Sequence, residues 1–289
     1  MPESRGVAPG STIAAQSSIV RLIDAHAHLN ADRFTDDLEL VVGAARMAGV
    51  ERMLVPGWDV ASSGRALELV DRWPWLDASV GVHPHDAARV DDAAWSAIEA
   101  WARDERVAAI GETGLDADRM FSPWEAQLEN LRRNLVLARE TGKPAILHCR
   151  SKDRRRDAQD ALVEELVGAG FDRPEADRPP AIVHSYSGPM DYAQTLITMG
   201  LAVSFSGLVS RRGEEASAEV ARLVPAERLL IETDSPFLAP PDAPRRRMEP
   251  AYVGITARWL AAQRKQDPDK LGDDLVGAYD HTIRRSRAR

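Results

Sequence analysis

Eight short apolar segments alternate with longer amphipathic ones, and this alternation restricts the fold more than any other feature of the sequence. The predicted strands are Val20–His28, Arg52–Pro56, Leu76–His83, Val107–Thr113, Ala145–Cys149, Ala181–His184, Leu201–Ser206 and Arg228–Thr233. The predicted helices between them include Asp37–Ala48, Ala61–Trp73, Asp92–Arg103, Glu125–Thr141 and Asp157–Gly168. Eight strand–helix units in 289 residues favour a closed (β/α)8 TIM barrel of the α/β class over an open, doubly wound sheet.

The first 18 residues are polar and rich in small side chains. They lack the basic start and long apolar stretch of a secretion signal, so we expect a flexible tail over 1–18 and a single barrel domain over 19–289. Apolar runs stay shorter than the roughly 18 residues that a membrane helix needs, so no membrane partner is expected. The single cysteine, Cys149, excludes an intrachain disulfide and suits a reducing compartment. We therefore expect a cytoplasmic protein, and a monomer.

The formal net charge of −8 leaves no global basic surface for a nucleic acid. DNA or another phosphodiester substrate would have to be held locally, at a metal site or by one of two arginine runs, 154–156 and 245–247. No predicted strand opens into GxGxxG or GxxxxGKS/T, which argues against both common nucleotide-binding folds.

Histidines gather at one end of the predicted strands. In a (β/α)8 barrel the chemistry lies at the carboxyl ends of the strands. Six of the seven histidines occur at such ends, and only His281 does not: the six are His26, His28, His83, His85, His148 and His184. Two carboxylates, Glu112 and Asp234, follow strands in the same way.

Several imidazoles and carboxylates in one barrel mouth are costly to desolvate unless they are paired or coordinated. Divalent cations satisfy both ligand types. The set is too large for one tetrahedral ion and suits two, an arrangement that recurs in enzymes cleaving phosphate esters. We expect Glu112 to bridge the two ions, and Asp234 both to bind one and to accept the proton of the attacking water. Cys149 is expected to face away from the mouth and pack.

Six ordered motifs, "DAHAHL", "GVHPHD", "IGETGLD", "LHCR", "VHSYSG" and "ETDSPFLAP", resemble the signatures of the TatD-type metal-dependent deoxyribonucleases. This family belongs to the amidohydrolase superfamily of TIM-barrel metal hydrolases. The likeness extends from about Ile19 to Tyr252.

The resemblance implies a metal-dependent 3′-5′ exodeoxyribonuclease that prefers single-stranded DNA. It implies one metal ion held by His26, His28, Glu112 and Asp234, and a second held by Glu112, His148 and His184. His83 and His85 are implied as substrate contacts, and Asp24 as a residue supporting the ligands. The ions are expected among Mg²⁺, Mn²⁺, Zn²⁺ and Ni²⁺, of which Mg²⁺ prefers mostly oxygen ligands.

Two other functions stay open. The stretch "RRRMEP" departs from the family pattern, where Arg246 and Met248 replace the usual Gly and Asn, so an amidohydrolase acting on a lactone, cyclic amide or phosphotriester is an alternative. Such enzymes often bridge their metals with a carboxylated lysine at the end of strand four, but here that position is Glu112 rather than a lysine. A catalytically inactive metal-binding scaffold is the second alternative, although all six ligands are retained.

Overall fold

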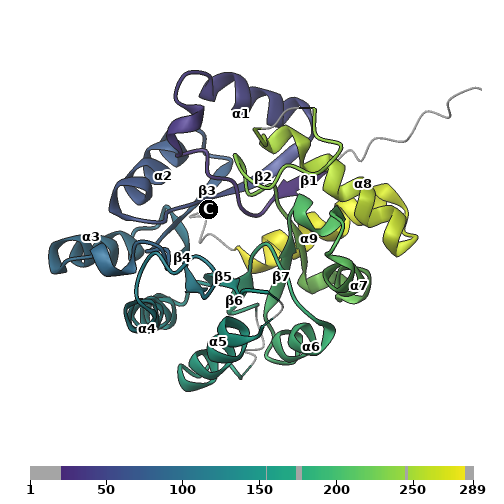
Figure 1. Ribbon diagram of the computed structural model, residues 1–289. Coiled ribbons are helices and arrows are strands. Elements are labelled where there is room, and N and C mark those ends of the chain that lie inside the picture. Colours follow the sequence, from purple (N-terminus) through teal and green to yellow (C-terminus); the bar gives the residue numbers. More distant parts are fainter. Residues whose placement is uncertain (1–20, 154, 174–177, 245–246, 284–289) are drawn as a thin grey trace, which may run out of the picture.

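The computed structural model describes residues 21–153, 155–173, 178–244 and 247–283, so the predicted tail over 1–18 lies outside the described residues. The described residues form an eight-stranded parallel barrel with helices around it (Figure 1). The strands are β1 (Leu22–Asp24), β2 (Val50–Pro56), β3 (Leu76–Val80), β4 (Val107–Asp116), β5 (Ala145–Arg150), β6 (Ala181–Val183), β7 (Ala202–Phe205) and β8 (Leu229–Ile231). Each strand pairs with the next along the chain, which confirms the predicted (β/α)8 barrel.

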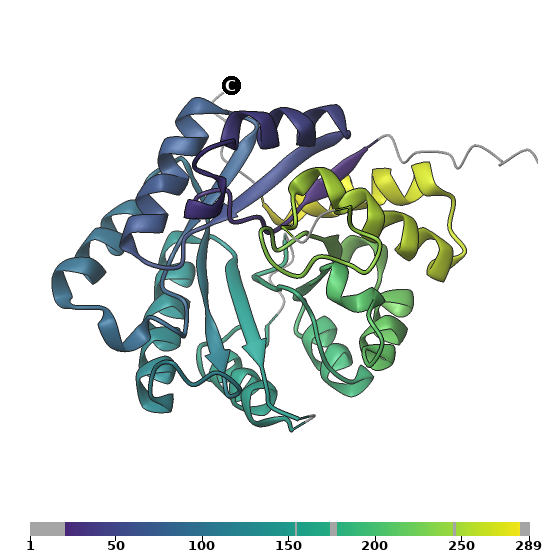
Figure 2. The ribbon, with the colours of Figure 1, turned by 45° about the horizontal axis from the view of Figure 1, so that its top comes forward.

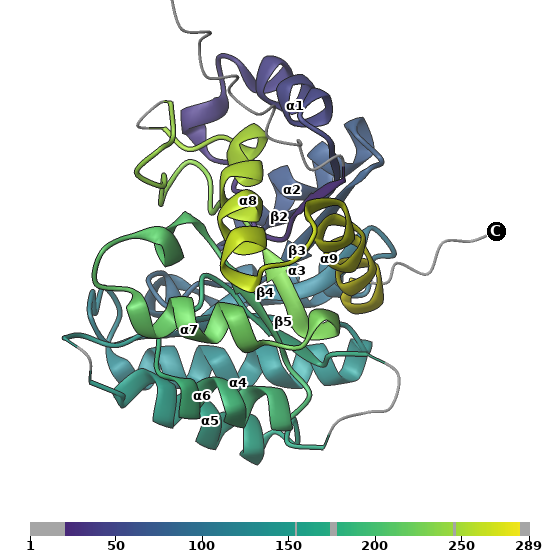
Figure 3. The same ribbon diagram turned by 90° about the vertical axis from the view of Figure 1, so that its right-hand side faces the viewer.

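Helices α1–α8 surround the barrel, and α9 lies across one of its ends (Figures 1 and 3). They are α1 (Leu38–Met47), α2 (Val60–Arg72), α3 (Asp92–Ala102), α4 (Trp124–Thr141), α5 (Asp157–Gly168), α6 (Met190–Thr198), α7 (Glu215–Leu223), α8 (Val253–Arg264) and α9 (Pro268–Thr282). The five helices predicted from the sequence agree with α1–α5 to within one residue at each end. Within the described ranges, none of the helices is both long enough and apolar enough to cross a membrane.

The first strand is shorter than predicted. We expected Val20–His28, but β1 ends at Asp24, and the residues after it form only an isolated bridge, between Ala27 and Ser235. The backbone amide of Ala25 turns to the carbonyl of Ile231, whereas that of Ala27 turns to Leu54 on the other side. This segment therefore joins the first and last strands and closes the barrel.

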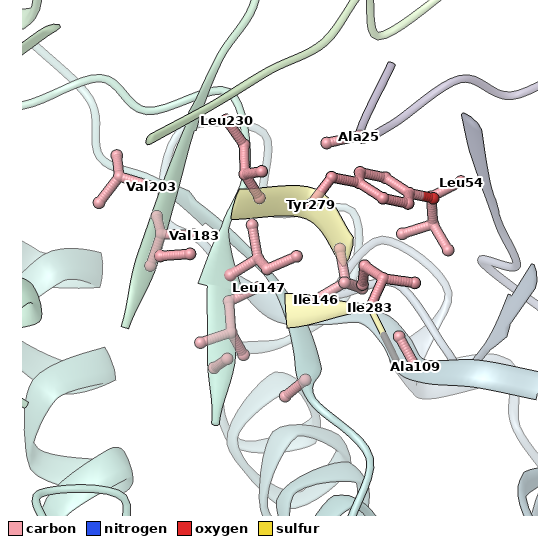
Figure 4. Packing of buried hydrophobic residues seen from close by; sticks show 14 of the residues in the cluster. Ala25, Leu54, Ala109, Ile146, Leu147, Val183, Val203, Leu230, Tyr279 and Ile283 are labelled. Atoms are coloured by element: carbon pink, nitrogen blue, oxygen red, sulfur yellow. The ribbon is translucent and has the colours of Figure 1, made fainter. Parts of the chain in front are cut away.

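The end of the barrel opposite the histidines is filled by α9. The hydroxyl of Tyr279 donates to Asp77, which lies at the start of β3, at 3.0 Å. Tyr279 and Ile283 pack among apolar side chains of the strands, such as Leu54 and Ile146 (Figure 4). His281 belongs to this helix and therefore lies at the opposite end of the barrel from the other histidines.

β4 and β5 run side by side (Figure 2). Glu112 belongs to β4 and His148 to β5. Gly114 of β4 pairs with His148 of β5 and adopts φ +138°, a conformation open to glycine. A Cβ atom at this position would lie 1.9 Å from the carbonyl oxygen of His148. The absence of a side chain at Gly114 thus lets β5 approach closely enough to bring His148 beside β4.

Candidate metal centre

The His-x-His segment is fixed by a buried carboxylate. Asp24 Oδ2 accepts a hydrogen bond from the Thr233 hydroxyl at 2.6 Å. Asp24 Oδ1 accepts from the backbone amides of Thr233 at 2.9 Å and of His26 at 3.3 Å. Burial raises the pKa of Asp24 to about 8, and these three hydrogen bonds oppose that rise by favouring the carboxylate. Asp24 therefore ties the end of β1 to the segment that follows β8, and it fixes the backbone beside His26.

Backbone hydrogen bonds then bring Asp234 to the histidines. The amide of Asp234 donates to the carbonyl of His26 at 2.9 Å, and the amide of His28 donates to Ser235 at 2.8 Å. Asp234 adopts φ +52°, in the left-handed region that Asp tolerates better than most residues. Its carboxylate lies 3.4 Å from His28 Nε2 and 3.9 Å from His26 Nε2.

Glu112 Oε2 faces this first group of ligands. It lies 3.2 Å from His26 Nε2 and 3.6 Å from His28 Nε2, and the two imidazole nitrogens are 3.1 Å apart. Ligands placed about 2.1 Å from a tetrahedral ion are separated from one another by roughly 3.4 Å. The two imidazole nitrogens are 3.1 Å apart, and each lies 3.2 to 3.9 Å from an oxygen of Glu112 and of Asp234, so one divalent ion fits beside both rings.

Glu112 Oε1 faces a second group. It lies 2.9 Å from His184 Nε2 and 3.3 Å from His148 Nδ1, and these two nitrogens are 3.4 Å apart. The spacing again matches that of ligands around one ion. The two oxygens of Glu112 therefore serve two separate sets of imidazole nitrogens, which is the geometry of a bridging carboxylate.

Two further carboxylates orient the second group. His184 Nδ1 lies 3.2 Å from Glu232, and His148 Nε2 lies 3.3 Å from Asp116. A proton donated to these acceptors leaves the lone pair of each ring on the nitrogen that faces Glu112. Sequence reasoning missed both acids. Asp116 lies four residues beyond Glu112 and Glu232 two before Asp234, but the backbone departs from a regular strand at Gly114 and at Asp234, so the spacing alone does not place them on the side of the ligands.

His83 lies within reach of Glu112 but differs from the other imidazoles. Its Nδ1 accepts a hydrogen bond from the backbone amide of His85 at 3.1 Å, and burial lowers its pKa to about 4. The ring is therefore neutral with its proton on Nε2, which points at Glu112 Oε1 from 3.2 Å. Distance alone would allow His83 to bind a metal with Glu112 and His148, but this tautomer makes it a hydrogen-bond donor.

The electrostatics of the cluster favour a cation at its centre. Burial by itself would raise the pKa of Glu112, yet the surrounding imidazoles hold it well below its usual range. Burial likewise opposes the charging of His184, but Glu112 and Glu232 raise its pKa well above the ordinary value. Both shifts have the same cause: the negative charge of these carboxylates stabilises positive charge placed among them.

Three other residues considered in the sequence lie outside the two ligand groups. His85 Nε2 lies 2.7 Å from Asp116, so His85 borders the site without joining the ligand groups. Cys149 packs against the core beside Tyr192, as expected. Lys143 donates to the carbonyls of Ala102 and Asp104, both at 2.7 Å, away from the end of β4 where a carboxylated lysine would bridge two metals.

The arginine runs are engaged with carboxylates in their described parts. Arg156 pairs with Asp160 at 3.0 Å, and with Asp191. Arg247 pairs with Asp37 at 2.6 Å and with Glu249 at 2.9 Å, which holds the segment before α8 against the start of α1. Arg154, Arg245 and Arg246 lie outside the described residues.

Three aromatic rings that were not predicted as site residues border the mouth on two sides. The Phe237 ring lies 6.0 Å from that of His28, and the Trp58 ring 5.2 Å from it. On the other side the Phe121 ring lies 4.7 Å from that of His85. Half or more of the Phe121 and Phe237 side chains is exposed, at 64% and 50%.

Comparisons with known proteins identify the family of this chain. An uncharacterized metal-dependent hydrolase, YabD from Bacillus subtilis, is 37% identical over 252 residues, covering 86% of this chain and 94% of its own. The 3′-5′ ssDNA/RNA exonuclease TatD of Salmonella typhimurium is 36% identical, with the same coverage. The crystal structure of the TatD homologue YJJV from Escherichia coli matches with a TM-score of 0.82 at 25% identity, covering 92% of this chain and 98% of its own. The profile of the family described as TatD related DNase matches residues 23–278. The resemblance drawn from six motifs is confirmed, and the chain belongs to the TatD related DNase family of metal-dependent hydrolases.

Proposed function

We propose that this chain is a metal-dependent phosphodiester hydrolase that removes nucleotides from the 3′ end of single-stranded DNA. The observation that carries the proposal is the position of Glu112, whose two oxygens face two separate sets of imidazole nitrogens. Relatives similar over most of their length are named 3′-5′ ssDNA/RNA exonuclease TatD, which supports the substrate class and the polarity.

Two divalent ions are part of the proposal. The first would be held by His26, His28, Glu112 and Asp234, and the second by Glu112, His148 and His184. A bound pair of this kind supplies a water activated at neutral pH and stabilises the charge on the attacking and leaving oxygens. The imidazole-rich donor set suits Zn²⁺, Mn²⁺ or Ni²⁺ better than Mg²⁺.

The chain's own residues have distinct roles in this proposal. Asp234 has a pKa below its usual value, because His28 and the neighbouring imidazoles outweigh the effect of burial. It is therefore ionised at neutral pH and accepts the proton of the attacking water. His83 Nε2 lies 3.2 Å from Glu112 Oε1, so its proton would pass from this oxygen to a phosphate oxygen when the substrate binds, and His83 would orient the substrate.

The test uses a single-stranded DNA oligonucleotide labelled at its 5′ end and protein that has been stripped with a chelator and reloaded with Mn²⁺. We expect a ladder of products that shorten progressively, and no cleavage without metal. Glu112→Gln should lower the rate at least about 100-fold, because the bridging charge is lost. His281→Ala, in α9 at the opposite end of the barrel, should keep nearly the full rate.

Two results would contradict the proposal. One is a fully metallated protein that leaves the oligonucleotide intact while hydrolysing a lactone or a phosphotriester, which would favour a small-molecule amidohydrolase. The other is an equal loss of activity in Glu112→Gln and His281→Ala, which would remove the assignment of the site.

A further inference from the structure

A cavity of about 380 Å³ lies next to the metal centre, lined by His85, Asp86, Arg89 and Phe121. This volume is at the small end of the range of ligand pockets, about 300–1,000 Å³, and suits one small ring and its substituents. The Phe121 side chain is 64% exposed and stands edge-on to the His85 ring at 4.7 Å. A phenyl ring with an open face at the rim of an active site is a platform on which another ring can stack.

The cavity connects directly to the ligand residues. His85 lies 2.7 Å from Asp116, and the same carboxylate oxygen lies 3.3 Å from His148 Nε2. The rings of His85 and His83 are 4.2 Å apart. His85 therefore contacts the cavity on one side and, through Asp116, the proposed ligand His148 on the other, so a nucleotide in the cavity would be a neighbour of the reacting phosphate.

The two walls of the cavity are joined by a buried hydroxyl. Ser122 Oγ donates to the carbonyl of His85 at 2.8 Å and accepts from the amide of Ala88 at 3.1 Å. Its own carbonyl accepts from the buried side chain of Gln127 at 2.9 Å. The segment that carries Phe121 is thus fixed to the segment that carries His85 and Arg89, and little ordering would be needed on binding.

Charge completes the case for a nucleotide. Arg89 is the positively charged residue that lines the cavity. Its side chain is 79% exposed, and one of its nitrogens lies 3.1 Å from Asp86. The other guanidinium donors stay accessible to a phosphate, and the Asp86 carboxylate can accept from a base amino group or a sugar hydroxyl. We propose that this cavity is the subsite for one nucleotide of the single-stranded substrate, in which the base stacks on Phe121 and a phosphate pairs with Arg89. The inference rests on the proposed nuclease function and adds the residues that hold the strand.

The first test compares KM and kcat for a single-stranded oligonucleotide among variants. Stacking on an aromatic residue is worth about 1–3 kcal/mol by alanine substitution, so Phe121→Ala should raise KM about 5- to 150-fold with kcat nearly unchanged. Phe121→Trp keeps a stacking surface and should keep a low KM. Leu223→Ala is the matched control, because Leu223 is equally exposed at 64% but lies at the end of α7.

Arg89 is tested in the same assay. Arg89→Ala should raise KM several-fold and reduce the dependence of KM on salt, because a phosphate contact is lost. Arg103→Ala is its control, because Arg103 is also exposed and forms a comparable ion pair, with Glu140 at 3.0 Å. The urea denaturation midpoint and the metal content of each variant should match those of the wild type, so that a change in KM can be attributed to binding of the DNA strand.

A second test measures the contribution of the stacked base directly. Oligonucleotides carrying one abasic residue at each of the last four positions are digested by the wild type and by Phe121→Ala. At the position that occupies the cavity, the abasic residue and Phe121→Ala should cost no more together than either alone. Penalties that multiply at every position, or a Phe121→Ala variant with the KM of the wild type, would overturn the subsite while leaving the nuclease function intact. A wild type that cleaves none of the oligonucleotides would overturn both.

Discussion

His184 meets two carboxylates, one through each ring nitrogen, and this arrangement decides which nitrogen can bind a metal. Its Nδ1 lies 3.2 Å from Glu232, which is fully buried, and its Nε2 lies 2.9 Å from Glu112. A proton held toward Glu232 keeps the Nε2 lone pair directed into the cluster. Glu232 is therefore a positioning residue for the second proposed metal.

Removing this carboxylate should weaken metal binding. We expect Glu232→Ala to lower the affinity for Mn²⁺ about 10- to 100-fold in a calorimetric titration, and Glu232→Gln to lie between Ala and the wild type because it keeps an acceptor. Asp77→Asn, a buried acid at the opposite end of the barrel, is the control and should leave the affinity unchanged. A Glu232→Ala variant with wild-type affinity would refute this role.

At the scale of elements, the close approach of β4 and β5 depends on Gly114. We expect Gly114→Ala to lower the free energy of unfolding by at least about 3 kcal/mol, because φ +138° is strained for alanine and its methyl group would meet the carbonyl of His148. Gly43→Ala provides the control, since Gly43 lies in α1 with nothing near its Cβ position. That variant should gain about 0.5–1 kcal/mol. Urea denaturation of the metal-free proteins measures both, and equal stability of the two variants would contradict the account.

The elements themselves could be predicted because their periodicity is local. α4 is an example, because Gly142 follows its last residue and ends the helix in the left-handed conformation, at φ +62°. The end of β1 could not be predicted, because the amides of Ala25 and Ala27 turn to opposite sides of the barrel, to β8 and β2. This choice depends on strands that are distant in the sequence.

The candidate ligands could be predicted because strand ends converge in a barrel, whereas their supporting residues could not be recognised as such. Asp116 and Glu232 differ from surface acids only in which imidazoles lie opposite them, and that depends on the register of neighbouring strands. Phe121 was missed for a similar reason, because a single aromatic residue in a loop carries no pattern. The tautomer of His83 follows from a backbone hydrogen bond that no sequence pattern encodes.

At the scale of the whole molecule, metal binding should stabilise the fold in a pH-dependent way. The pKa of His184 is raised, and that of His148 is raised too, as Asp116 and Glu112 outweigh the effect of burial. In the metal-free protein these protonated rings stabilise the fold at low pH, and the stabilisation is lost as pH rises through the raised pKa values. A metal ion must displace the same protons to bind, so the stabilisation by metal increases as pH rises.

Thermal denaturation with and without Mn²⁺ measures this effect. With free metal at 100 times its Kd we expect about 2.7 kcal/mol of stabilisation at pH 8, or an increase in Tm of roughly 5–10 °C. The increase should shrink steadily toward pH 5.5. A metal-induced shift that is the same at both pH values would mean that these histidines do not bind the ions.

The central claim is that six side chains from distant parts of the chain hold a pair of divalent ions, with Glu112 between them. Anomalous diffraction from crystals soaked in Mn²⁺ tests it most directly. The account predicts two peaks in the barrel mouth, one beside His26, His28 and Asp234 and the other beside His148 and His184. A mouth without a peak, or a single peak that Glu112 does not contact, would contradict it.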